Sequence, residues 1–230
     1  MNRTLKFINT LIFSILFILL VVSFSIAVPI LFRPLYYMLI DPLKITSLTG
    51  FSKEELIFSF NELMDCLVLY KEPFSEGVFA FSESGMNHFL DCRILFTLDL
   101  VVFAISLPLF FIYLLLIGKG KIKIYHPFSA SPLFLASFVP IILLGTFAIF
   151  ALIDVDSAFT FFHSILFPGK TNWVFDPKTD PIINALPMEV FLSYGIIILS
   201  IIFIVLISVI TVNSIRIHKN NNVRIYKSRR

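Results

Sequence analysis

The sequence ILFTLDLVVFAISLPLFFIYLLLI, residues 94–117, decides the fold of this chain. A helix needs about 20 apolar residues to cross the hydrocarbon core of a bilayer, and this run meets that length with a single acidic residue, Asp99. Three other runs of the same kind lie at residues 7–32, 132–153 and 190–213. Together they predict an all-α integral membrane protein built as a four-transmembrane-helix bundle.

The composition agrees with this fold class. Of the 230 residues, 58% are apolar and only 14% are charged, and the mean hydropathy is +0.94. These values exclude an ordinary soluble domain. We interpret the net charge of +3 as a sign of membrane topology and of contact with anionic membrane lipid. The sequence has no RNA- or DNA-binding pattern, so we expect no nucleic acid partner.

The basic residues predict how the helices are oriented. Segments 1–6, 118–131 and 214–230 contain eleven of the eighteen Lys and Arg residues and no acidic residue. Because cytoplasmic loops are enriched in Lys and Arg, we expect both termini and the 118–131 loop on the cytoplasmic side. Residues 33–93 and 154–189 are then two extracytoplasmic loops, which we expect to form a small cap.

The first apolar run has an alternative interpretation as a cleaved signal peptide. Arg3 and Lys6 form a basic start, and Ser25-Ile26-Ala27 resembles a cleavage site. The apolar core is, however, longer than the usual 7–15 or so residues, and cleavage would leave an odd number of spans. We therefore expect a retained anchor, with residues 1–230 forming a single multi-pass domain in the cell membrane.

Two shorter helices are expected in the extracytoplasmic loops. Ser52-Lys-Glu-Glu55 is a capping box, in which the N-cap side chain and a carboxylate three residues later each bond the other's backbone. This box opens an amphipathic helix over residues 53–69. Residues 155–167, which are rich in Phe, predict a second helix that is partly embedded in the membrane.

Two histidines are the candidates for chemistry. His88 lies just before the second span, and His163 opens the stretch HSILFPGKTNWVFDP, residues 163–177, before the fourth span. Both are expected on the outer side, next to different spans, so folding can bring them together. Because histidine exchanges a proton near neutral pH, the pair indicates acid–base chemistry at the lipid headgroup level. The alternative is that each histidine only anchors the end of its helix.

Three charged residues near the second span are candidates for support or substrate binding. Asp91 lies one helical turn from His88 and could orient its ring, as in a catalytic triad, or could be a solvated carboxylate at the helix start. Arg93 could bind a phosphate or carboxylate, or could extend to the interface. Asp99 lies inside an apolar run, where a charge is costly and usually functional.

The segment after His163 contributes the remaining candidates. Thr171, Asn172 and the backbone amides near Gly169 could donate to an oxyanion, or could satisfy a turn. Trp173 is either an interface anchor or one wall of a lipid pocket.

The cysteines and the metal-binding patterns leave several alternatives open. Cys66 and Cys92 could form a disulfide, Cys92 could be a nucleophile, or both could be buried free thiols. His88, Asp91 and His163 are too loosely spaced to predict a metal site, so we expect no metal and no cofactor. A GxSxG elbow, an HExxH motif and a glycine-rich phosphate loop are all missing from the sequence.

Two blocks of this sequence resemble those of a known family. They are FSESGMNHFLDCR, residues 81–93, and FFHSILFPGKTNWVFDP, residues 161–177. Together with four spans and both ends inside, they are similar to the lipoprotein intramolecular transacylase (Lit) family of Gram-positive bacteria. The likeness in topology covers the whole chain. Some members have an acidic residue where Gly85 stands here and Val where Cys92 stands, which argues against a role for position 85 and against a nucleophilic Cys92.

The resemblance implies an acyltransferase that acts on bacterial lipoproteins modified with diacylglyceryl. The sn-2 acyl chain would move to the α-amine of the N-terminal cysteine and give the lyso-form lipoprotein. The resemblance also implies catalysis by two histidines, here His88 and His163, at the outer leaflet. We expect His88 to be the base, because Asp91 could orient it, and His163 to be the proton donor or oxyanion partner.

Two functions of other classes compete with this one. A non-enzymatic membrane assembly partner would tolerate substitution of both histidines. A small proton-coupled transporter would depend on Asp99 and not on the histidines, although four spans without an internal repeat are unusual for a transporter.

Overall fold

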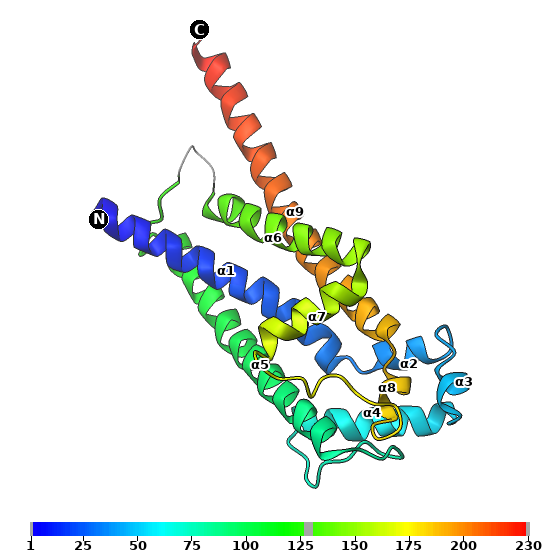
Figure 1. Ribbon diagram of the computed structural model, residues 1–230. Coiled ribbons are helices and arrows are strands. Elements are labelled where there is room, and N and C mark those ends of the chain that lie inside the picture. Colours follow the sequence, from blue (N-terminus) through cyan, green and yellow to red (C-terminus); the bar gives the residue numbers. More distant parts are fainter. Residues whose placement is uncertain (1, 127–130, 229–230) are drawn as a thin grey trace. The chain divides into compact units, whose positions relative to one another are not determined.

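The computed structural model describes residues 2–126 and 131–228, and it describes side chains as far as residue 219. Residues 127–130 of the predicted cytoplasmic loop and the basic side chains beyond residue 219 therefore lie outside the described part. Every regular element in the described residues is a helix (Figure 1). The prediction of an all-α protein is confirmed.

Four of the helices are long and apolar enough to cross a membrane. They are α1 (Arg3–Leu31), α5 (Glu83–Gly118), α6 (Pro132–Ile153) and the Met188–Lys219 part of α9 (Met188–Ser228). Each contains one of the four predicted apolar runs almost entirely, so the four predicted spans are confirmed as helices. The side of the membrane on which each end lies, the extracytoplasmic cap and the single domain stay predictions.

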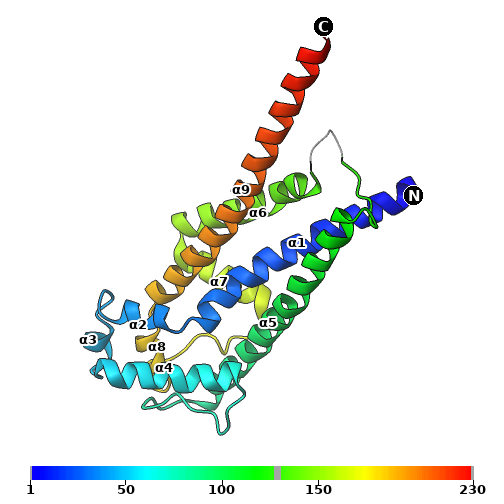
Figure 2. The ribbon, with the colours of Figure 1, turned by 180° about the vertical axis from the view of Figure 1, so that it is seen from behind.

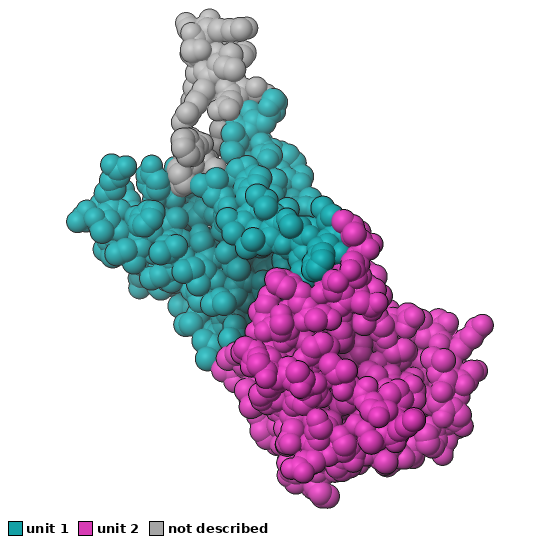
Figure 3. All heavy atoms as spheres, in the orientation of Figure 1, with its two compact units in different colours: residues 1–25, 102–150, 199–230 teal, residues 26–101, 151–198 magenta. Residues whose placement is uncertain are grey.

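The chain divides into two compact units (Figure 3). The first unit contains residues 1–25, 102–150 and 199–230. Within it α1 and α5 lie side by side in both ribbon views (Figures 1 and 2), and the Phe13 and Phe110 rings stack with centroids 5.3 Å apart. The Tyr113 hydroxyl donates to Asn9 Oδ1 over 2.9 Å between the same two helices. Most apolar side chains of the candidate spans are exposed or only partly buried, as lipid contact requires.

The second unit contains residues 26–101 and 151–198 and has a densely packed apolar core. Its short helices are α2 (Pro34–Ile40), α3 (Ile45–Thr49), α4 (Lys53–Val68), α7 (Val155–Leu166) and α8 (Ile182–Ala185). Tyr36 is 1% exposed, stacks on Phe60 with ring centroids 4.1 Å apart, and donates to the Ala185 carbonyl over 3.0 Å. Contacts of this kind, between segments far apart in the sequence, fix the frame on which the candidate site is built.

Helix α4 forms as its sequence predicts. Ser52 is the N-cap and Glu55 completes the capping box. The predicted apolar face is buried at all positions except Ile57, which is partly buried against the core; its other residues are Leu56, Phe60, Leu63, Met64 and Leu67. Helix α7 also lies where the Phe-rich segment predicted it.

Candidate active site on α5 and α7

Helix α7 places His163 on its last turn. The helix opens at Asp154, whose carboxylate accepts a hydrogen bond from the Ser157 backbone over 3.0 Å. His163 is 8% exposed, and its Nδ1 donates to the Phe159 carbonyl over 2.8 Å. Because a carbonyl only accepts, Nδ1 carries the hydrogen of the neutral ring and Nε2 keeps its lone pair.

Helix α5 places His88 on its second turn. The Ser82 hydroxyl caps the helix by accepting from the Gly85 backbone over 3.0 Å. Asp180 holds this cap, because its carboxylate accepts from the Ser82 backbone over 2.7 Å and from the Ser82 hydroxyl over 2.9 Å. His88 is therefore set on a fixed helix start and is 6% exposed.

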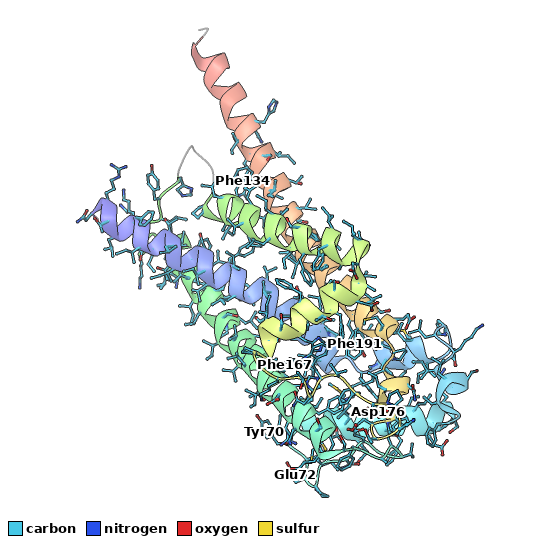
Figure 4. All side chains as sticks on the ribbon, viewed as in Figure 1. Tyr70, Glu72, Phe134, Phe167, Asp176 and Phe191 are labelled. Carbon is cyan, nitrogen blue, oxygen red and sulfur yellow. The ribbon has the colours of Figure 1, made fainter. Side chains whose placement is uncertain are left out.

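The two buried histidines lie next to each other, an arrangement that their places beside different spans had made possible. Their ring centroids are 6.0 Å apart, with 39° between the ring planes. Phe167, labelled in Figure 4, lies beside both, with its centroid 4.9 Å from that of His88 and 5.8 Å from that of His163. Trp173 stacks on His163 at 4.7 Å. The pair thus lies in an aromatic surrounding that excludes bulk water.

The surroundings of the two rings differ. Burial lowers the pKa of His163 below its ordinary value of 6.5, and the hydrogen bond to the Phe159 carbonyl offsets part of this effect. His163 is therefore neutral at pH 7. In His88 the Nε2 atom lies 3.5 Å from the Cys92 thiol, whereas Nδ1 is buried with no hydrogen-bond partner among the described residues.

Asp91 has partners that the sequence did not predict. Lys170 forms an ion pair with its Oδ1 at 2.6 Å, and the Asn172 amide donates to its Oδ2 over 3.3 Å. Both oxygens are therefore engaged by the segment after α7, and the structure gives no hydrogen bond from Asp91 to His88. His88 was assigned as the general base because Asp91 could orient it, and the structure does not support that reason. The role of each histidine stays a prediction.

Arg93 and Asp99 lie outside the histidine cluster. The Arg93 guanidinium forms an ion pair with Glu72 at 2.9 Å and lies over the Tyr70 ring, 5.0 Å from its centroid. Figure 4 labels both of these partners, in the segment that leads into α5. Asp99 is half-buried, and its Oδ2 has no hydrogen-bond partner among the described residues. Substrate binding by either residue stays a prediction.

The residues after α7 are arranged around the pair. Trp173 covers one face of His163 and donates from Nε1 to the Lys170 carbonyl over 3.0 Å. The Asn172 amide nitrogen is occupied by Asp91, and its Oδ1 is buried without a partner among the described residues. Thr171 is exposed, and its carbonyl accepts from the Val174 backbone over 3.1 Å. An oxyanion role for Thr171 and Asn172 stays a prediction.

Both cysteines are free thiols, so the disulfide alternative does not hold. Cys66 is buried at 3.8 Å from the carbonyls of Pro73 and Ser75, whereas Cys92 lies beside His88. In the described ranges, no three His, Cys, Asp or Glu side chains are grouped as ligands for a metal ion.

Sequence reasoning missed four residues that shape this site. Lys170 and Asp180 make their contacts across 79 and 98 positions of the chain, and local spacing cannot find such partners. Phe159 and Phe167 are two of 28 Phe residues. Their positions four residues before and after His163 were the available signal, since residues at this spacing share a face of a predicted helix over 155–167.

The arrangement brings two imidazoles close enough to act on one small group. Proton transfer works over hydrogen-bond distances of about 2.6–3.2 Å or through one water molecule. Rings 6.0 Å apart can therefore serve two atoms of one small group that lies between their nitrogens. This geometry suits a reaction in which one atom loses a proton while a neighbouring atom gains one.

Comparisons with known proteins agree with this architecture. The family model described as lipoprotein intramolecular transacylase Lit matches residues 11–191. The chain is similar to a structure of the membrane-integral Lit from Bacillus cereus, with a TM-score of 0.80 and 24% identity over 93% of this chain and 96% of that one. A variant of the same protein with a His-to-Arg substitution gives a TM-score of 0.72 at 23% identity, over 94% and 93% of the two chains. These likenesses show the fold. No curated protein matches the chain.

Proposed function

The chain belongs to the lipoprotein intramolecular transacylase (Lit) family, and from this membership we propose that it is an acyltransferase acting on bacterial lipoproteins. Its substrate carries a diacylglyceryl group on the N-terminal cysteine. The enzyme moves the sn-2 acyl chain from the glyceryl oxygen to the α-amine of that cysteine. The product is the lyso-form lipoprotein, with an N-acyl group and a free glyceryl hydroxyl.

The observation that carries this proposal is the pair of buried histidines. His88 comes from α5 and His163 from α7, and their rings meet 6.0 Å apart inside an aromatic cluster. Burying two imidazoles costs free energy unless each polar atom is satisfied. One His88 nitrogen has no partner among the described residues, as expected for an atom that serves a substrate.

The proposed reaction needs no acyl-enzyme, because donor ester and acceptor amine belong to one molecule. The amine nitrogen attacks the ester carbonyl carbon and a C–N bond forms. The C–O bond to the glyceryl oxygen then breaks, the nitrogen loses one proton and the oxygen gains one. Holding the two groups in contact supplies much of the rate, since well-oriented intramolecular reactions gain up to about 7–11 kcal/mol.

The hydrogen bonds of the two rings suggest a division of roles. In His163 the donor nitrogen is held by the Phe159 carbonyl, which leaves Nε2 with a lone pair to accept the amine proton. His88 Nδ1 then serves the carbonyl oxygen or the leaving glyceryl oxygen. This division reverses the assignment made from the sequence, which depended on a contact between Asp91 and His88.

The apolar side of α7 supports a site at the membrane surface. Phe161, Phe162 and Ile165 are 50%, 46% and 60% exposed, whereas His163 on the same helix is buried. A short helix with one apolar exposed side and one side packed on protein fits the interface between acyl chains and headgroups. Together with the positive-inside rule, this supports our proposal that the site lies at the outer leaflet and both termini in the cytoplasm.

The test is mass spectrometry of a lipoprotein N-terminal peptide. Membranes that contain this protein are incubated with a diacylglyceryl lipoprotein, and membranes without it serve as the control. The proposal predicts one acyl chain on the α-nitrogen and one on the glyceryl group. If both chains remain on the glyceryl group in both samples, the proposed activity is wrong.

A further inference from the structure

The segment after α7 makes a turn that directs Lys170 toward α5. Gly169 has a φ of +75°, a left-handed conformation that costs glycine little, and Lys170 donates from its backbone to the Phe167 carbonyl over 3.1 Å. The turn thus reverses the chain directly after the helix that carries His163. Its direction brings residues 170–173 back beside the two histidines.

One carboxylate of α5 holds this turn at two points. Asp91 Oδ1 accepts from the Lys170 ammonium at 2.6 Å, and Asp91 Oδ2 accepts from the Asn172 amide at 3.3 Å. The Asp91 side chain is 19% exposed and that of Lys170 is 49% exposed. A partly exposed ion pair of this kind contributes little to the free energy of unfolding. It can nevertheless determine the position of a loop.

The same turn carries the indole that lies on His163. Trp173 Nε1 donates to the Lys170 carbonyl over 3.0 Å, and its ring stacks on His163 at 4.7 Å with 27° between the planes. The contacts therefore run without a gap from Asp91 on α5, through Lys170 and Trp173, to the His163 ring on α7.

We propose that Asp91 and Lys170 form a positioning pair for His163, acting through Trp173. No hydrogen bond joins the pair to either histidine ring. It seats the turn on α5 and so fixes the indole that limits the movement of the imidazole. Catalytic geometry is sensitive to displacements of about 1 Å, so a weak surface contact can still have a measurable effect on rate. The consequence for rate depends on the proposed transacylase function, whereas the seating of Trp173 does not.

The test uses the fact that Trp173 is the only tryptophan of the chain, so fluorescence reports on this one contact. We compare Lys170→Met with Lys170→Arg, which keeps the charge, and with Lys178→Met, which removes an exposed lysine from the same loop. In Lys170→Met we expect acrylamide quenching of Trp173 to rise about twofold and lyso-form production to slow about tenfold. Lys170→Arg and Lys178→Met should stay near wild type in both measurements.

A charge reversal distinguishes loss of the Asp91–Lys170 ion pair from a general disruption of the loop. Asp91→Lys and Lys170→Asp should each loosen Trp173, and the double variant should restore low quenching. The proposal is overturned if Lys170→Met leaves the quenching unchanged, or if the double variant is quenched as strongly as the single ones. If the wild-type protein has no transacylase activity, the proposed function is wrong. The quenching measurements would still test whether Asp91 and Lys170 position Trp173.

Discussion

Replacement of Glu76 by Gln is expected to stabilise the protein at alkaline pH. Glu76 lies between α4 and α5, is 1% exposed, and has two carboxylate oxygens without a hydrogen-bond partner among the described residues. Burial, and in second place the nearby Asp180 carboxylate, raise the pKa of Glu76 from 4.5 to about 8. At neutral pH this side chain is therefore protonated in the folded protein.

The sign and size of the effect follow from proton linkage. Between pH 4.5 and about 8 the folded state binds more protons at Glu76 than the unfolded state does, so the free energy of unfolding falls as pH rises through this window. Each pH unit is worth about 1.36 kcal/mol, which gives an upper bound of about 5 kcal/mol lost by pH 8. Above the folded pKa the loss is complete. Glutamine cannot ionise and removes this loss.

The assay is thermal unfolding of the purified protein in detergent micelles between pH 5 and pH 9. For a chain of this size about 1 kcal/mol corresponds to roughly 2–4 °C in Tm. We expect the Tm of Glu76→Gln to match that of wild type near pH 5 and to exceed it by up to about 10–20 °C at pH 8.5. Glu54→Gln, at an exposed position on α4, is the matched control. Parallel Tm curves for Glu76→Gln and wild type across the whole range would refute the reasoning.

Two further predictions concern the same unit. Gly85→Ala should lower the free energy of unfolding by about 1–3 kcal/mol, because the added Cβ would lie 2.2 Å from Asp180 Oδ1. In the control Gly195→Ala the added Cβ meets nothing within 4 Å, so we expect no such loss. Thermal unfolding at pH 7 compares the two variants. Acidification should quench Trp173 fluorescence with a midpoint below pH 6.5, since burial lowers the pKa of the stacked His163. The quenching should disappear in His163→Ala, and a midpoint above pH 7 would contradict the stated burial effect.

The sequence was sufficient for the helices because their signals are local. The apolar run at 94–117 has the length of a bilayer span, and the Ser52 capping box marks a helix start within four residues. Both patterns depend on neighbouring residues alone. The meeting of His88 and His163 was predictable only as a possibility, from their places beside different spans. The distance between the two rings is set by the packed core of the second unit, which the sequence alone does not give.

The partners of the charged residues were out of reach of the sequence. Helical spacing puts Asp91 near His88, and that neighbourhood suggested a triad-like contact. The structure joins Asp91 to Lys170 and Asn172 instead, since a turn 79 positions away lies against α5. The buried Glu76 was missed for a related reason. A polar loop residue is ordinarily exposed, and only the folded unit encloses it.

The most direct test of the proposed chemistry is the fate of the acyl chain when one histidine is lost. His88→Gln and His163→Gln are each compared with His126→Gln, which alters an exposed histidine outside the site. Purified variants in proteoliposomes are incubated with a diacylglyceryl lipoprotein, and mass spectrometry follows the N-acylated peptide. We predict that each site variant loses at least about 100-fold in rate, the usual contribution of acid–base catalysis, while His126→Gln keeps the wild-type rate. Full lyso-form production by either site variant would contradict catalysis by the histidine pair.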